Sequence, residues 1–230
     1  MSCGSPACSG AALSGKAKVA KAPAGKSVIV IAGEDSNDCR ALEILIRELQ
    51  PSLKSKLVRI SDPVRLKTAT EGNLSQRIRT IVNKAKARAA RDRARLSGII
   101  LHEDLDAPTG PHYSAVRSRL ADALAKHSPC GTALALAAEE TEAWLLLFPD
   151  AFPHVHPGWS VPAQLRGKDT GTIKGPKELL KKKLGTPIYR ESEGPDIMLA
   201  AQQSGLLVSP VGTNQSYLDF VADLNDLRVG

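Results

Sequence analysis

The sequence is poor in aromatic residues and in cysteine, and it has no long apolar run. Only 3% of its 230 residues are Phe, Trp or Tyr, so a core has to be built mainly from aliphatic side chains. The four cysteines, Cys3, Cys8, Cys39 and Cys130, include no C-x-x-C pair, which argues against a zinc ribbon or a thioredoxin-type motif. No stretch approaches about 18 consecutive apolar residues, so we expect no membrane span.

Two common catalytic signatures are also missing. The sequence has no G-x-x-x-x-G-K-[ST] loop, so we do not expect this chain to hydrolyse ATP by itself. It has no G-x-S-x-G segment, the usual signal of an α/β-hydrolase serine. Charge, in contrast, is plentiful: 31 Lys and Arg against 24 Asp and Glu give a net charge of +7. This excess favours a polyanionic partner such as nucleic acid.

The first 26 residues differ in composition from the rest of the chain. They are rich in Gly, Ala, Ser, Pro and Lys and lack a continuous apolar core, so they predict a flexible basic tail over 1–26 and not a secretory signal. Together with the few cysteines, this favours a cytoplasmic protein. From residue 27 onward, apolar runs alternate with amphipathic stretches. Strands are expected at 28–31, 57–60, 99–101 and 133–137, and helices at 37–49, 74–96, 114–126 and 139–147.

Strands that alternate with helices indicate parallel pairing through right-handed crossovers. The sequence therefore predicts an α/β domain over 27–148, with a central parallel four-stranded sheet between layers of helices. After Phe148 the alternation ends, and 149–172 is rich in Pro, Gly and His. Three further helices are expected at 176–184, 195–204 and 216–227. The part 149–230 is thus interpreted as an irregular loop and a helical extension packed on the same core.

Acidic residues follow three of the four expected strands. Glu34 follows the first, Asp104 and Asp106 the third, and Glu139 and Glu142 the fourth. The carboxyl ends of parallel strands meet at one edge of a sheet, where binding sites form. In an extended segment Asp104 and Asp106 point the same way, and on a helix Glu139 and Glu142 share a face. We therefore expect these acids to converge.

Carboxylate oxygens are the ligands that Mg²⁺ prefers. One or two Mg²⁺ or Mn²⁺ ions held by these acids would activate a water molecule and neutralise a departing phosphate oxygen. The predicted metal ligands are Glu34, Asp104, Asp106, Glu139 and Glu142. The structural alternative is that acids after strands cap helices and interact with the helix dipole.

The expected helix over 74–96 is strongly basic, with eight Lys or Arg and one Asp. At about 100° per residue one stripe consists of Arg77, Lys84, Arg88, Arg91 and Arg95. We expect this stripe to bind a phosphate backbone. A solvated surface helix or a contact with an acidic partner subunit would explain it too, although solvated helices usually mix charges of both signs.

Three lysines of the loop region add to this basic character. Lys168 and Lys174 are expected to contact nucleic acid, and Lys177 is expected to steady the scissile phosphate as part of the catalytic set.

The strand followed by Gly33 and Glu34, with Asp104-x-Asp106 seventy residues after Glu34, resembles the Toprim domain of topoisomerases, primases and several nucleases. The segment 138–146, AEETEAWLL, resembles an uncharacterised Toprim-related bacterial family with an acid-x-Glu-Ala-Trp motif, and 175–180 resembles that family's later lysine segment. The resemblance covers roughly 27–185. It implies a Toprim-like three-layer fold, a D-x-D that binds Mg²⁺, a Glu34 that acts as general acid/base or metal ligand, and an ATPase partner in a bacterial anti-phage system.

This sequence departs from the Toprim pattern at two positions. Asp35 stands where Gly often follows the Glu, and Pro108 stands in place of a third acid, whose role would pass to Glu139 or Glu142. Hydrolysis is therefore a simpler expectation than topoisomerase chemistry. The resulting hypothesis is a Mg²⁺-dependent nuclease acting on DNA or RNA. The alternatives are a non-catalytic subunit that binds nucleic acid or a partner through a degenerate site, and a phospho-receiver-like signalling domain.

Overall fold

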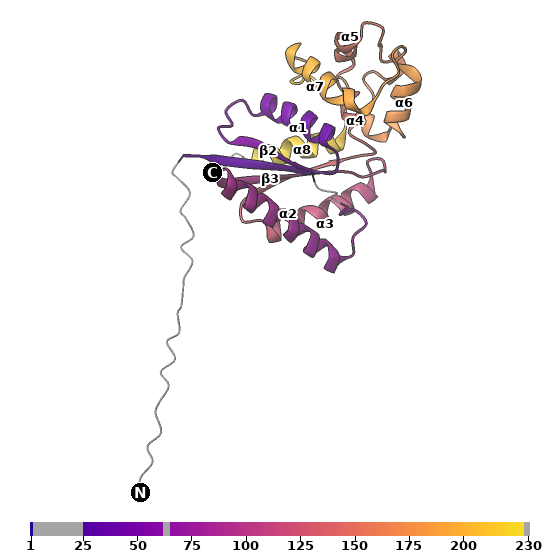
Figure 1. Ribbon diagram of the computed structural model, residues 1–230. Coiled ribbons are helices and arrows are strands. Elements are labelled where there is room, and N and C mark those ends of the chain that lie inside the picture. The colour runs from indigo at the N-terminus through magenta and orange to yellow at the C-terminus, as the bar shows by residue number, and fades with distance from the viewer. Residues whose placement is uncertain (2–24, 62–64, 228–230) are drawn as a thin grey trace.

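The computed structural model describes residues 1, 25–61 and 65–227 (Figure 1). Most of the tail expected over 1–26 lies outside these residues. The strands are β1 (Ser27–Gly33), β2 (Lys56–Ser61), β3 (Arg95–Asp104) and β4 (Gly131–Ala137). The α-helices are α1 (Ser36–Leu49), α2 (Glu71–Arg91), α3 (Pro111–His127), α4 (Glu142–Leu145), α5 (Phe152–Val155), α6 (Pro176–Lys183), α7 (Gly194–Gln203) and α8 (Gln215–Asp226). Single 3₁₀ turns are η1 (Pro149–Ala151), η2 (Ala163–Leu165), η3 (Thr170–Thr172) and η4 (Glu191–Glu193).

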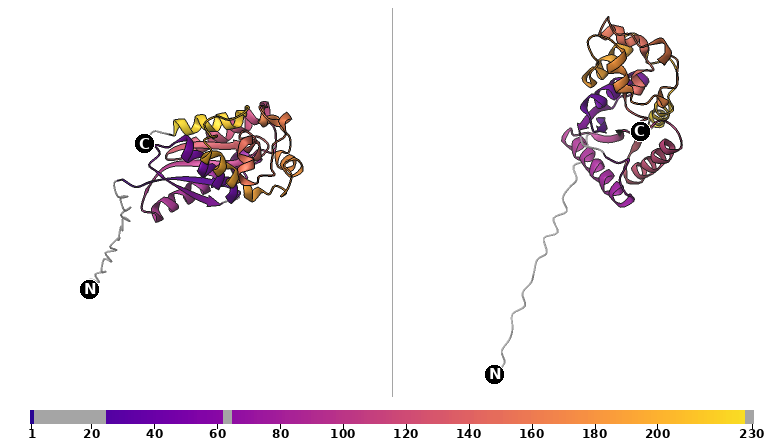
Figure 2. Two further views of the ribbon diagram at one scale, coloured as in Figure 1. Left: turned by 90° about the horizontal axis from the view of Figure 1, so that it is seen from above. Right: turned by 90° about the vertical axis from the view of Figure 1, so that its right-hand side faces the viewer.

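The strands form one four-stranded sheet in the order β2-β1-β3-β4, and all pairs are parallel. Helices α1 and α8 cover one face, and α2 and α3 cover the other (Figures 1 and 2). This arrangement confirms the predicted α/β fold with a central parallel sheet, and it is consistent with a Toprim-like three-layer architecture. Because the sheet is covered on both faces, its central strands need apolar residues at nearly every position.

Strand β4 shows how the sequence divides the core between the two faces. Ala133, Ala135 and Ala137 belong to the apolar cluster beneath α1 and α8, whereas Leu134 and Leu136 belong to the cluster beneath α2 and α3. Side chains alternate between the faces of a strand, so the small alanines all line the face on which α8 packs. Small residues there leave room for the large aromatic side chains of α8.

The expected helix over 74–96 is too long at its C-terminal end. Helix α2 ends at Arg91, and β3 already begins at Arg95. The chain turns at Arg93, which adopts a left-handed φ of 50° although it is not a glycine. Arg95 is therefore a strand residue, and the prediction that it extends a helical stripe is wrong.

The expected helix over 139–147 is also wrong in its first turn. Helix α4 begins only at Glu142, and Glu139 has a left-handed φ of 57°. Glu139 is fixed there by the loop after β3, because the Asp106 N–H donates to the Glu139 carbonyl at 3.0 Å and the Glu139 N–H donates to the Ala107 carbonyl at 2.7 Å. Glu139 and Glu142 consequently do not share a helix face.

The region after Phe148 contributes to the same core as the sheet. Helix α7 packs on α1, and α8 packs on β4. Trp144 stacks on Phe220 of α8 with ring centroids 5.4 Å apart, and the Trp159 indole N–H donates to the Pro187 carbonyl at 2.6 Å. None of the helices in the described part of the chain is both long and apolar enough to cross a membrane.

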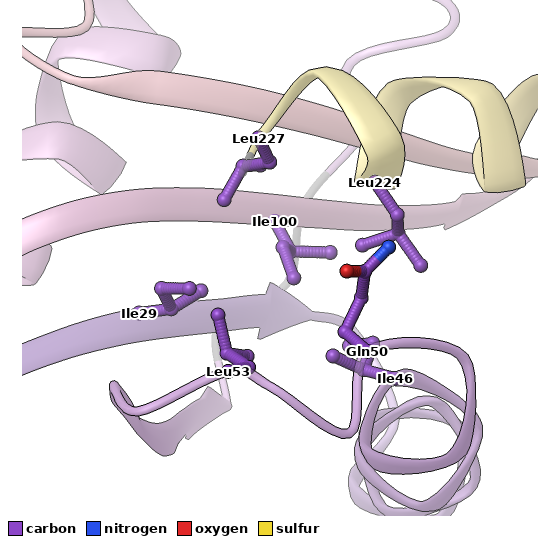
Figure 3. Close-up of a pocket in the computed structure, with 7 residues that line it drawn as sticks. All are labelled: Ile29, Ile46, Gln50, Leu53, Ile100, Leu224 and Leu227. Atoms are coloured by element: carbon purple, nitrogen blue, oxygen red, sulfur yellow. The ribbon is translucent and has the colours of Figure 1, made fainter. Parts of the chain in front are cut away.

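A small pocket lies between the sheet and the C-terminal end of α8 (Figure 3). Its volume is about 10 Å³, and its lining is apolar apart from Gln50. A space of this size holds at most about one water molecule. This pocket is therefore too small to hold a substrate.

Candidate active site

Acids predicted from the sequence lie at the edge of the sheet where β1, β3 and β4 end. Glu34 directly follows β1, Asp104 is the last residue of β3, and Glu142 begins α4 shortly after β4. Three segments that are distant in sequence thus bring carboxyl groups to one edge, as the parallel topology requires.

Asp104 is held firmly at this edge. Its Oδ1 accepts hydrogen bonds from the Thr141 backbone N–H at 3.0 Å and from the Thr141 hydroxyl at 3.1 Å. The His102 Nε2 lies 3.5 Å from the same oxygen and 2.9 Å from the Thr141 hydroxyl. Among the described residues, the side-chain contacts of Asp104 all involve Oδ1. Its Oδ2 therefore remains available to a further ligand.

Two other carboxyl groups interact electrostatically with Asp104. Asp38 lies in the first turn of α1, where burial raises its pKa to about 6. The positive charge of His102 opposes this rise, and the negative charge of Asp104 adds to it. Burial likewise raises the pKa of Glu142 to about 7, opposed by Lys177 and reinforced by Asp104 and Asp38. Burial is the main cause of both shifts, and the neighbouring acidic charge adds to them. A bound cation would relieve the part that comes from negative charge.

His102 lies beneath these carboxyl groups with only 1% of its surface exposed. Burial by itself would lower its pKa, but the hydrogen bond to Asp104 and the charges of Asp38 and Asp104 raise the pKa to about 9. The imidazolium charge offsets part of the acidic charge above it. Its Nδ1 has no hydrogen-bond partner among the described residues.

Gly33 permits this packing beneath the site. A Cβ atom at position 33 would lie 2.8 Å from the Cys39 Sγ and 3.2 Å from the His102 Cβ, and both groups are buried. A side chain at this position would displace them. The glycine that precedes Glu34 is therefore required by the contact between β1 and its neighbours.

The loop region and α6 supply a lysine and a tyrosine to the same edge. The Lys177 Nζ lies 3.3 Å from a Glu140 carboxylate oxygen and 3.4 Å from one of Glu191. Burial would lower the pKa of Lys177, but the charges of Glu142, Glu140 and Glu191 raise it, so the ammonium group stays charged. The buried Tyr189 hydroxyl donates to the Glu142 Oε1 at 3.1 Å.

Glu34 and Asp106 have cationic partners from the segment after β2. The Arg65 Nε lies 3.5 Å from the Glu34 Oε1, and the Lys67 ammonium contacts the Asp106 carboxylate. Asp106 has a left-handed φ of 57°, so the segment after Asp104 is not extended. The extended segment in which Asp104 and Asp106 would point the same way is therefore not formed, and Asp104 interacts with Thr141 whereas Asp106 interacts with Lys67.

A buried carboxylate positions that segment. Glu103 is 2% exposed, and its two oxygens accept from the backbone N–H groups of Leu66 and Lys67 at 2.9 to 3.2 Å. The Lys67 Nζ in turn donates to the Asp104 carbonyl at 2.8 Å. Glu103 therefore holds Lys67 beside the candidate site.

Glu139 is at the periphery of this group. Its Oε2 accepts from the Gly175 N–H at 3.2 Å, which ties the loop after β4 to the start of α6. Lys174 is exposed next to this contact, and Lys168 is exposed on the loop before η3. The two lysines and Glu139 thus lie on the loops that border the edge.

The basic stripe expected on one helix is divided in the structure. Arg77 donates to the Arg65 carbonyl near the candidate site, whereas Arg88 lies at the other end of α2, with its Nε 3.4 Å from Asp92. Lys84 and Arg91 are exposed on α2. Fourteen residues separate Arg77 from Arg91, which corresponds to about 21 Å along a helix. Most of the stripe therefore leads away from the carboxyl groups.

Arg95 belongs to a different surface. Burial raises the pKa of the Cys130 thiol, and the charges of Arg95 and Lys86 both oppose that rise. The two cations thus lie near Cys130, at the amino end of the sheet.

The side chains fit a metal site only in part. Within the described residues, no three His, Cys, Asp or Glu side chains converge closely enough to hold a metal ion as they stand. Mg²⁺ usually takes only one or two protein carboxylates and keeps several water molecules. Two groups of acids can be compared as ligands for such an ion. Glu34 and Asp106 already have cationic partners. The better candidates are Asp104, which has an available oxygen, and its neighbours Asp38 and Glu142.

Sequence reasoning missed several of these groups. Asp38 occupies the first turn of a helix and His102 lies near the end of a strand, and neither position by itself indicates a functional site. Thr141 lies inside the acid-rich segment but carries no charge. Tyr189 lies 47 residues beyond Glu142, so no spacing pattern connects the two.

No family model matches the chain, and neither the curated proteins nor the solved structures include one that matches it.

Proposed function

We propose that this protein is a divalent-metal-dependent nuclease that hydrolyses phosphodiester bonds of DNA or RNA at the carboxyl edge of its sheet. The observation that carries the proposal is the grouping of Asp38, Asp104 and Glu142 at one edge of the sheet, where they come from three separate segments. Burial, reinforced by neighbouring acidic charge, raises the pKa of Asp38 to about 6 and that of Glu142 to about 7. The net charge of +7 supports a polyanionic substrate.

Asp104 and its neighbours Asp38 and Glu142 would hold Mg²⁺ or Mn²⁺. When bound, such an ion supplies a Lewis acid and lowers the pKa of a coordinated water molecule. Before the ion binds, the pKa values of Asp38 and Glu142 are raised to about 6 and about 7. Because a carboxyl group must lose its proton to bind a metal ion, binding at this site would release protons near neutral pH.

Lys177 would steady the scissile phosphate. Its ammonium group remains charged and is held by Glu140 and Glu191 beside Glu142. Thr141 and His102 would hold Asp104 in a fixed orientation. Preorganised groups of this kind act on developing charge without further rearrangement.

A non-catalytic binding subunit is the competing proposal. It is favoured by the ion pairs of Glu34 with Arg65 and of Asp106 with Lys67, because cations there neutralise two of the acids that the Toprim resemblance assigns to catalysis. The ATPase partner and the role in anti-phage defence follow from that resemblance alone.

Metal dependence separates the two proposals. Purified protein is titrated with Mn²⁺ and Mg²⁺ by calorimetry, and is incubated with labelled single- and double-stranded DNA and RNA with each ion or with EDTA. The nuclease proposal requires saturable metal binding and cleavage that stops in EDTA and in Asp104→Asn. Nucleic-acid binding without metal binding or cleavage would favour the non-catalytic subunit.

A further inference from the structure

The free edge of the sheet carries a row of basic side chains. Strand β2 is at one end of the strand order, so it has no outer neighbour within the described chain. Lys54, Lys56 and Arg59 are exposed along it. Arg88 of α2 lines the same edge. Four cations, from β2, the segment before it and α2, therefore border one strand.

Two open grooves run along this edge and meet at Lys56. The first has a volume of about 490 Å³, and Lys26, Lys54 and Lys56 contribute the cations of its lining. The second has a volume of about 470 Å³ and is lined by Lys56, Arg59 and Arg88 together with residues of α1. Because Lys56 lines both, we name the combined surface the β2 track, with Lys26, Lys54, Lys56, Arg59 and Arg88 as its cations.

The acids of the β2 track are outnumbered. Asp92 lies 3.6 Å from the Lys56 Nζ and 3.4 Å from the Arg88 Nε, and Glu43 lies 3.2 Å from the Arg59 Nε. Five cations thus face two carboxylates. The Lys56 and Arg59 side chains are the exposed partners of these pairs, whereas Asp92, Glu43 and Arg88 are partly buried. Ion pairs with an exposed partner contribute little free energy, so a phosphate group can bind Lys56 or Arg59 at low cost.

The β2 track leads toward the candidate active site. Ser36 lines its second groove, two residues beyond Glu34, and Arg65, which follows β2, contacts Glu34. The six residues of β2 span about 20 Å. This length matches about six nucleotides of a stacked strand at 3.4 Å each.

We propose that the β2 track binds the sugar–phosphate backbone of one nucleic-acid strand and guides it past Glu34 to the carboxylate edge. This inference rests on the nucleic-acid substrate of the proposed function and identifies the surface that recognises it. Charged side chains also keep an edge strand from pairing with other strands. That role alone requires no affinity for phosphate, and binding experiments distinguish the two.

The test measures binding in EDTA, so that it does not depend on cleavage. The affinity of a fluorescein-labelled single strand of about 12 nucleotides is measured by anisotropy across a salt series. The track variant is Lys54→Gln/Lys56→Gln/Arg59→Gln. The matched control, Arg79→Gln/Lys86→Gln/Lys126→Gln, removes the same charge from exposed positions elsewhere. Thermal unfolding shows whether each variant is folded.

We expect the track variant to bind at least about tenfold more weakly at low salt, with a slope of log K against log salt that is shallower by about 2, since each phosphate contact contributes about 0.7 for a single strand. The control should change the slope by less than about 0.7. Equal losses in the two variants, no loss in either, or equally effective competition by poly-glutamate would overturn the proposal. Binding through the track without cleavage at any metal concentration would count against the nuclease and not against the track.

Discussion

Thr141 donates both its backbone N–H and its hydroxyl to a single oxygen of Asp104, at 3.0 and 3.1 Å. The same hydroxyl lies 2.9 Å from the Nε2 of the buried His102. The threonine thus connects the end of β3 with the loop after β4. Because it fixes one carboxylate oxygen and leaves the other available, it determines which side of Asp104 a ligand meets.

Replacing Thr141 by valine should therefore destabilise the protein and disturb the site. Valine keeps the shape and the backbone N–H but removes the hydroxyl, which leaves the Nε2 of the buried His102 with only its longer contact to Asp104, at 3.5 Å. We expect a loss of about 1–3 kcal/mol in the free energy of unfolding, measured by urea denaturation. Thr172→Val is the control, because the exposed Thr172 hydroxyl contacts only the Asp169 carbonyl. Equal effects of the two substitutions would show that the Thr141 hydroxyl has no special role.

Asp104→Asn should abolish metal-dependent cleavage while leaving the fold intact. The amide oxygen still accepts from Thr141, but the charge that interacts with Asp38 and Glu142 is lost. We expect cleavage to fall by more than about a hundredfold, with nucleic-acid binding in EDTA unchanged. The surface control is Asp122→Asn on α3, where the carboxyl group is exposed. An unfolded Asp104→Asn protein would mean that this acid is structural.

The sequence sufficed to predict the fold and the edge of the sheet where the acids gather. Continuous β-branched runs such as the one in β1 mark buried parallel strands, and the topology then places Glu34 and Asp104 at the same edge. Both inferences depend on local patterns, which a single sequence contains. The apolar residues of α2, from Leu74 to Ala89, recur at helical spacing in the same local way and are buried.

The features that could not be predicted have two causes: left-handed backbone without its usual sequence signal, and contacts between segments that are distant in sequence. The turn at Arg93 was missed because left-handed backbone is usually marked by glycine or asparagine, and neither occurs there. The left-handed backbone at Asp106 was missed for the same reason, and with it the pairing of Asp106 to Lys67. The interaction of Asp38 with Glu142 arises only when α1 and α4 come together beside Asp104.

Glu103→Gln should loosen the segment that carries Lys67. An amide at this position retains one acceptor oxygen and directs its N–H groups toward the N–H groups of Leu66 and Lys67. We expect a loss of about 2–3 kcal/mol in stability, together with faster hydrogen exchange of the Leu66 and Lys67 amides. The Val30 amide, in the centre of the sheet, is the internal reference. Unchanged exchange at Leu66 and Lys67 would show that Glu103 does not hold this segment.

The raised pKa of Glu142 predicts a specific pH dependence of stability in metal-free buffer. Its pKa is about 7 in the folded protein against an ordinary value of 4.5, so protonated Glu142 favours the folded state. This contribution is complete below pH 4.5 and is lost as the pH rises toward 7. His102 has its pKa raised from 6.5 to about 9, so its stabilising contribution is lost only above pH 6.5. The interval between pH 4.5 and 6.5 therefore reports on the carboxyl groups and not on His102.

Glu142→Gln tests this dependence, because glutamine resembles the protonated acid at every pH. Between pH 4.5 and 6.5 we expect the wild type to lose about 2 kcal/mol more than the variant in urea denaturation, since each pH unit between the two pKa values contributes about 1.4 kcal/mol. Asp38, whose pKa is raised to about 6, leaves a smaller dependence of the same sign in both proteins. Glu71→Gln, at the exposed start of α2, should follow the wild type. Parallel curves of stability against pH for the wild type and Glu142→Gln would mean that Lys177 and Tyr189 stabilise the charged Glu142 carboxylate enough to offset the cost of its burial.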